Sequence, residues 1–207
     1  MFGRSGLRLA ILSAALTLAG SGVWAQPPAT SFKDTTAFPG GPTGARIKSL
    51  IEVVNSGNVD RIKRFIADEC AGDFKQKIPI EDHISTALGF QRDTGGVDFH
   101  SVRSYTPERP GTTVVIVKDR VLGGWWGLSL RFGDAPSFFV AGLGINGARP
   151  PAGLVEPPLS EKEAVGEIQA LMARVKKTGW YSGTVLVARG ADVLLTDFAG
   201  EASKAFH

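Results

Sequence analysis

The spacing of apolar residues changes abruptly near residue 95, and this change constrains the fold more than any other feature of the chain. Before it, apolar side chains recur every three or four residues, as in 47–54, which is typical of amphipathic helices. After Gly95-Gly96, short runs of β-branched and aromatic residues alternate with turns, which indicates strands. Helices followed by strands favour an α+β domain, with helices packed on one face of an antiparallel sheet.

The same patterns set the expected element positions. Asn55-Ser56-Gly57 ends a first helix that starts near Thr43, and Asn58 caps a second helix. Pro79 suits the first turn of a third helix that extends to about Leu88. Four strands are expected, at 97–105, 112–119, 125–132 and 138–143, in a meander.

The first 25 residues have the pattern of an export signal. Arg4 and Arg8 precede the short apolar run 9–19, and small residues lead to a cleavage point between Ala25 and Gln26. The run is shorter than the roughly 20 residues that span a bilayer. We therefore expect a secreted or periplasmic protein with no membrane association after cleavage; an uncleaved anchor is the alternative.

Charge and cysteine content exclude some classes of protein. Arg4 and Arg8 belong to the 23 basic residues, so the chain after residue 25 has 21 basic and 20 acidic residues. No long basic cluster remains, which argues against nucleic acid as a partner. Cys70 is the single cysteine in the sequence, so no intramolecular disulfide can form, and we expect a small buried side chain.

Proline content divides the rest of the chain. Residues 26–42 are rich in Pro, Thr, Ala and Gly and are interpreted as a linker. Residues 149–159 contain four prolines and predict a semi-rigid spacer after an α+β domain at 43–148. Ser160 and Glu163 form a capping box for a further helix, followed by a β-hairpin with strands at 183–188 and 193–198. A lone hairpin is marginally stable, so it needs partners.

Residues 180–206 carry a family resemblance. Trp-Tyr-Ser-Gly-Thr-Val-Leu-Val-Ala-Arg-Gly, followed by a second strand and Phe-Ala-Gly-Glu-Ala, resembles the opening strands of the beta-lactamase-related serine hydrolases, which include penicillin-binding proteins. The resemblance implies that 160–207 is the start of such a domain. In that family a Ser-x-x-Lys follows, in which the serine attacks a carbonyl and the lysine activates it.

The 207 residues contain no Ser-x-x-Lys. Lys177-Thr178-Gly179 spells a family triplet, but its place at the end of a helix predicts a helix C-terminus instead. Tyr181-Ser182 is similarly misplaced for a catalytic tyrosine motif. We therefore expect a truncated hydrolase, inactive alone, with no catalytic, metal-binding or cofactor-binding residues. An acyl substrate would be a partner only of a full-length form.

Residues 43–148 resemble the accessory domain of some secreted members, with a cone-like shape similar to nuclear transport factor 2. That resemblance implies a pocket between helices and sheet, in which His83, Asp98, His100 and Tyr105 are the candidates to supply acid–base chemistry. Strand alternation places Asp98 and His100 on one face, too few ligands for a metal. The alternative is that these polar side chains face solvent, with one buried, hydrogen-bonded tyrosine among them. A non-catalytic binding or dimerisation module is the second functional hypothesis, and a homodimer stays open.

Overall fold

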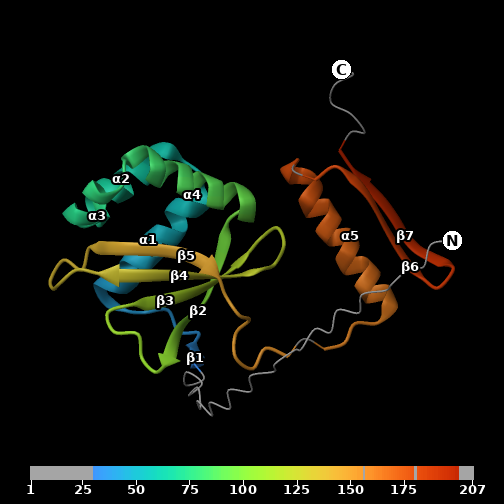
Figure 1. The fold of residues 1–207 in the computed structure, drawn as a ribbon, viewed down its shortest axis with the longest axis horizontal. Helices are drawn as coiled ribbons and strands as arrows, with labels where there is room; N and C mark the ends of the chain where they lie inside the picture. Colours follow the sequence, from blue (N-terminus) through green and yellow to red (C-terminus); the bar gives the residue numbers. More distant parts are fainter. Residues whose placement is uncertain (1–29, 156, 180, 201–207) are drawn as a thin grey trace, which may run out of the picture.

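A computed structural model describes residues 30–155, 157–179 and 181–200 of the chain (Figure 1). An α+β unit comes first and a helix with a β-hairpin follows. The elements, in order, are β1 Ser31–Thr35, α1 Gly41–Ser56, α2 Val59–Glu69, α3 Gly72–Lys77, α4 Ile80–Thr94, β2 Val97–Thr106, β3 Thr113–Asp119, β4 Trp125–Phe132, β5 Val140–Gly147, α5 Glu161–Thr178, β6 Gly183–Arg189 and β7 Asp192–Ala199.

Strands β1 to β5 form one antiparallel sheet in sequence order. The register puts one row of residues across all five strands: Asp34, Arg103, Val114, Ser129 and Gly144 are successive cross-strand partners. Since directly paired residues of an antiparallel sheet share a face, this row defines the face that carries them, here called the outer face. The α+β architecture and the antiparallel meander expected from the sequence are thereby confirmed.

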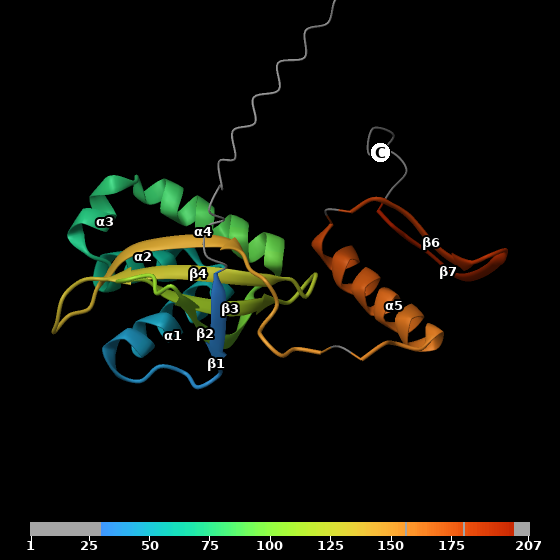
Figure 2. The same ribbon diagram turned by 60° about the horizontal axis from the view of Figure 1, so that its bottom comes forward.

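The hydrophobic core lies between the helices and the opposite face of the sheet. Val115, Val117, Leu128 and Leu130 are fully buried there, together with apolar side chains of α1, α2 and α4. Figure 1 shows α2, α3 and α4 along the β5 side of the sheet, and Figure 2 shows α1 toward β1 and β2. Alternation along β3 separates the two faces of the sheet, because Val115 and Val117 point to the core while Val114 and Ile116 point to the outer face.

The helix boundaries follow local capping chemistry. Gly57 ends α1 in the left-handed conformation that glycine adopts without steric cost. Just before it, Asn55 exchanges hydrogen bonds with the backbone of Val97 at 2.8 and 2.7 Å, which fastens α1 to the start of β2. The Asn58 side chain accepts a hydrogen bond from the Arg61 amide and caps α2, as the sequence predicts.

Several elements differ from the sequence expectation, and α4, expected to end near Leu88, continues to Thr94. Residues 31–35, inside the predicted linker at 26–42, form β1 and pair with β2 along their whole length. The short helix α3, at Gly72–Lys77, was not expected from the apolar spacing. Strand β5 also starts later than 138, because Phe138 has a φ of +46° and belongs to the turn that precedes the strand.

The first part of the Pro-rich segment is held on the outer face. Arg103 donates hydrogen bonds to the carbonyl oxygens of Arg149 and Pro150, and the Ala152 amide donates to Asp34 at 2.9 Å. The segment 149–152 is therefore packed against the sheet, whereas residues 153–155 and 157–159 are exposed.

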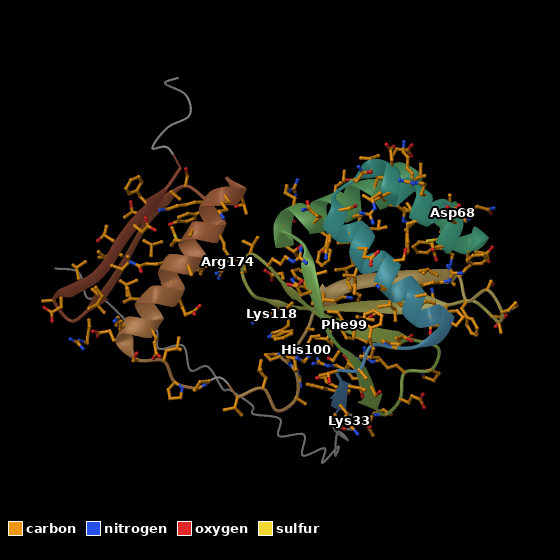
Figure 3. All side chains as sticks on the ribbon, turned by 180° about the vertical axis from the view of Figure 1, so that it is seen from behind. Lys33, Asp68, Phe99, His100, Lys118 and Arg174 are labelled. Carbon is orange, nitrogen blue, oxygen red and sulfur yellow. The ribbon has the colours of Figure 1, made fainter. Side chains whose placement is uncertain are left out.

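Helix α5 and the β6–β7 hairpin form a second, smaller unit. Ser160 and Glu163 make the predicted capping box at the start of α5, and Gly179 ends the helix. The hairpin packs one face against α5, where Lys176 Nζ lies 2.5 Å from an Asp197 carboxylate oxygen. Arg174 joins the two units by donating to the Val121 carbonyl oxygen at 2.8 Å, and Figure 3 labels this side chain on α5.

The predicted signal segment and its cleavage point at Ala25-Gln26 lie outside the described residues. Within the described part of the chain, no helix is both long enough and apolar enough to cross a bilayer.

Candidate functional site

The α+β unit contains a mainly apolar cavity of about 260 Å³ between its helices and strand β5. Such a cavity is slightly smaller than ordinary small-molecule sites, which start at about 300 Å³. Most of its lining is aliphatic or aromatic, and its polar lining comes mainly from α4. The lining residues are Leu50, Val53, Val54, Ile62, Phe65, Ile66, Cys70, Phe74, Ile78, Asp82, His83, Thr86, Ala87, Val140, Leu143 and Ile145.

His83 is the most informative polar residue of the cavity wall. Its Nε2 atom is buried and has no hydrogen-bond partner within the described residues. The imidazole packs against Phe74, with ring centroids 4.8 Å apart and planes inclined by 41°. A buried polar atom without a partner is costly, so the nitrogen is available to a water molecule or to a polar group of a bound ligand.

Cys70 lines the same cavity but is not equipped as a nucleophile. Burial raises the pKa of its thiol to about 11; nearby Glu69 adds to the effect, while Lys75 and Arg46 oppose it. The reactive form of cysteine is the thiolate, and little of it exists near neutral pH at such a pKa. Cys70 also pairs with Val140 in a short parallel bridge, so its position attaches the end of α2 to the edge of β5.

The four pocket candidates from the sequence do not converge. His83 lines the cavity beneath the helices, whereas Tyr105 lines a separate groove on the outer face. Asp98 pairs with Lys118 in the β2–β3 register and is bonded through its carboxylate to Arg120 at 2.6 Å. The Arg120 hydrogen bonds lower the pKa of Asp98, against a smaller opposing effect of burial, which suits an exposed ion pair better than a general base.

His100 occupies an irregular position in β2. The register shifts between Phe99 and Ser101, so His100 is the extra residue of a β-bulge. Its Nδ1 lies 3.0 Å from the Ser101 hydroxyl, and its ring meets Trp125 edge-on with centroids 5.0 Å apart. Figure 3 labels Phe99 and His100 on β2 close to Lys118 on β3. The bulge could not be foreseen from alternation.

Sequence reasoning missed most of the cavity wall. The aromatic side chain of Phe74 comes from the unexpected helix α3, and β5 contributes Val140, Leu143 and Ile145. The sequence of α4 did contain a usable signal for His83, because it lies at helical spacing from Ala87 and Phe90, two apolar residues that face the core. Across the described residues, no three His, Cys, Asp or Glu side chains come together in a way that could hold a metal ion.

The groups that line the cavity are suited to holding a ligand. The cavity offers one imidazole nitrogen in an apolar enclosure, with the Asp82 and Thr86 side chains at its lining. No paired nucleophile and base lie together among the described lining residues, because the Cys70 thiol is protonated and His83 Nε2 has no protein partner. An apolar molecule with a single hydrogen-bonding group fits this environment.

Comparisons with protein-family models, with curated proteins and with solved structures find no match to this chain.

Proposed function

We propose that the chain is the amino-terminal portion of an exported serine hydrolase related to the beta-lactamases. In this proposal the unit 31–148 is an accessory module of cone-like shape. Residues 160–207 supply the first helix and first two strands of the hydrolase domain, and the acyl substrate binds residues that lie beyond them.

The hairpin carries the proposal from the structural side. Strands β6 and β7 pair with each other and, among the described residues, with no further strand. One face of the hairpin packs on α5, while Leu186 and Phe198 on the other face are 62% and 71% exposed. A two-stranded sheet with open edges and an exposed apolar face is marginally stable alone and is expected to join a larger sheet.

The chemistry follows from the missing nucleophile. A Ser-x-x-Lys places the hydroxyl and the amine on one helix face, and these 207 residues contain no such motif. The Lys177-Thr178-Gly179 triplet lies at the end of α5 and at its C-cap glycine, so it has a structural role there. The chain by itself should turn over neither nitrocefin nor p-nitrophenyl esters.

The test is to read the gene beyond codon 207. An open frame that reaches a Ser-x-x-Lys within a few dozen codons would support the proposal. A stop codon directly after His207 would overturn it, and so would serine-dependent hydrolysis of nitrocefin by the 207-residue chain. The hydrolysis assay shows whether the nucleophile lies within residues 1–207 or beyond them, because only in the first case is the 207-residue chain active.

A second function has its own observation. The apolar cavity favours a non-catalytic module that binds a small ligand, because the His83 Nε2 at its wall has no partner in the described part of the chain. An apolar probe with one hydroxyl, such as 2-naphthol, should bind the wild-type chain and raise its melting temperature. His83→Phe should abolish this shift, because it fills the space and removes the nitrogen. An unchanged shift in the variant would exclude the cavity as the binding site.

A further inference from the structure

A second concave region lies on the outer face of the sheet, away from the helices. Its volume is about 670 Å³, within the range of small-molecule sites. The wall on one side comes from β1, β2 and the β2–β3 turn, and the wall on the other side comes from the end of β5. The lining residues are Thr30, Phe32, Arg103, Tyr105, Arg109, Val114, Gly127, Ser129, Asn146, Gly147, Ala148 and Arg149.

The floor of this groove is made of small residues. Gly127, Ser129 and Gly147 line it, and the cross-strand partner of Ser129 is Gly144. Small side chains at these positions leave the sheet surface open where larger ones would fill it. The hydroxyl of Ser129 and the amide of Asn146 are the neutral hydrogen-bonding groups at this floor, and both can donate to an oxyanion.

The charge of the groove is positive. The charge of Arg103 is neutralised by Asp34, and its guanidinium also donates to the carbonyl oxygens of Arg149 and Pro150. Arg103 therefore stabilises the fold and is not available to a ligand. Arg109 and Arg149 differ from it, because both are exposed and neither forms an ion pair within the described residues. Two arginines without an ion-pair partner among the described residues therefore line one cavity.

Aromatic packing fixes one of these arginines in place. The Arg109 guanidinium lies 3.8 Å from the centroid of the Tyr105 ring, and Arg103 covers Phe32 at the same distance. A stacked guanidinium keeps its N–H edge free for hydrogen bonds and loses less rotamer freedom when it binds a ligand. Since the arginines cover one face of each ring, the groove presents charge more than aromatic surface.

We propose that this groove binds a small multivalent oxyanion, a molecule with at least two carboxylate or phosphate groups. Arg109 and Arg149 each take one anionic group, and Ser129 and Asn146 donate to the oxygens between them. The planar guanidinium fork matches carboxylate and phosphate oxygens and forms charge-assisted hydrogen bonds, which are stronger than those between neutral groups. The proposal is independent of the hydrolase assignment and of the cavity beneath the helices.

The test uses the 207-residue chain with citrate, pyrophosphate and hexaglutamate as probes, measured by calorimetric titration at low ionic strength. We expect saturable binding of at least one probe, weakened by added salt because the attraction is partly screened. Citrate or pyrophosphate binding identifies a free small oxyanion as the ligand. Binding of hexaglutamate alone would move the assignment to acidic peptides and overturn the small-molecule form of the proposal.

Variants separate a built site from general attraction to a basic surface. Arg109→Gln with Arg149→Gln should weaken binding at least tenfold, since a charge-assisted hydrogen bond contributes about that factor or more. The control is Arg61→Gln with Lys63→Gln, which removes the same charge from exposed positions on α2 and should leave affinity unchanged. Ser129→Leu keeps every charge but fills the floor, and should also abolish binding. No saturable binding of any probe, or equal loss in the control, would overturn the proposal.

Discussion

Arg103 and Asp34 form a buried, two-pronged ion pair between β2 and β1. Arg103 donates from Nε to one carboxylate oxygen at 2.8 Å and from Nη2 to the other at 2.9 Å. Their side chains are 2% and 5% exposed. The pair fixes the first strand to the sheet and, through the Ala152 amide, holds the segment that leads to α5. A contact between residues 69 positions apart thus unites three parts of the chain.

Asp34→Asn should destabilise the protein by about 3 kcal/mol, because it leaves the buried Arg103 guanidinium without a counter-charge. Urea unfolding of the chain measures this change. Asp98→Asn is the matched control, since it breaks an ion pair with Arg120 whose side chains are 65% and 45% exposed. The control should cost less than about 1 kcal/mol. Equal losses in the two variants would show that the buried pair has no special weight.

The same pair predicts an acid-sensitive stability. Burial alone would raise the pKa of Asp34, but the hydrogen bonds from Arg103 and Ala152 and the charges of Arg103 and His100 outweigh it and lower the pKa. The unfolded chain then binds this proton more tightly than the folded one. The stabilisation is complete above the ordinary aspartate pKa of about 3.9 and is lost as pH falls below it toward the folded-state value.

Unfolding free energies measured between pH 7 and pH 3 test this point. The wild-type chain should lose stability more steeply than Asp34→Asn over the acidic part of the range, because the variant has no carboxylate to protonate at this position. Parallel curves for the two proteins would contradict the prediction.

The sequence alone predicted the helices and strands in which apolar residues recur with a clear period. Helices α1, α2 and α4 and strands β2, β3 and β4 follow directly from apolar spacing, because each buries a continuous stripe or face. Strand β1 escaped for a physical reason. Its five residues are stabilised by pairing with β2 and by Asp34 reaching Arg103, contacts that no local pattern within 26–42 contains.

The candidate site was less predictable than the fold. The sequence marked His83 as a polar candidate, but the residues that surround its imidazole depend on how α3, α4 and β5 pack together. Tyr105 belongs to a different face, because the strand register and the bulge at His100 decide which way each β2 side chain points. Arg109 and Arg149 flank one groove although 40 positions of chain separate them, so only the folded sheet places them together.

Cys70 should react very slowly with thiol reagents while the protein is folded. At a pKa of about 11, about one thiol in a thousand is ionised at pH 8, whereas an ordinary cysteine is ionised to about a quarter. Reaction with a chromogenic disulfide reagent should become fast once urea unfolds the chain. Rapid reaction of the folded protein would show that the α2–β5 junction opens readily.

His83→Phe should stabilise the protein by about 1 kcal/mol in the absence of ligand. The substitution removes a buried nitrogen that has no partner within the described residues and extends the contact with Phe74 into the adjacent cavity. Urea unfolding measures the change, and Thr86→Val, at another polar position of the cavity lining, is a conservative comparison. A loss of stability in His83→Phe would mean that Nε2 has a partner in solution, such as an enclosed water molecule.

Amide hydrogen exchange should divide the chain into a protected sheet and an exposed hairpin. Strands β3 and β4 are central, each paired on both sides, and Val115, Val117 and Leu130 are fully buried. Strands β6 and β7 pair with each other and with no other strand of the described chain. Leu186 and Phe198 are exposed on the hairpin face that points away from α5. Exchange in 183–199 should therefore proceed by local opening, at a lower free-energy cost than the global unfolding that limits 114–130.

The Arg174→Ala variant, which loses the hydrogen bond to the Val121 carbonyl oxygen, should speed exchange in α5 and the hairpin while leaving exchange in β3 unchanged. Equal protection of 183–199 and 114–130 would show that the hairpin is stable without further strands, and would remove the main structural support for its assignment to a larger hydrolase sheet.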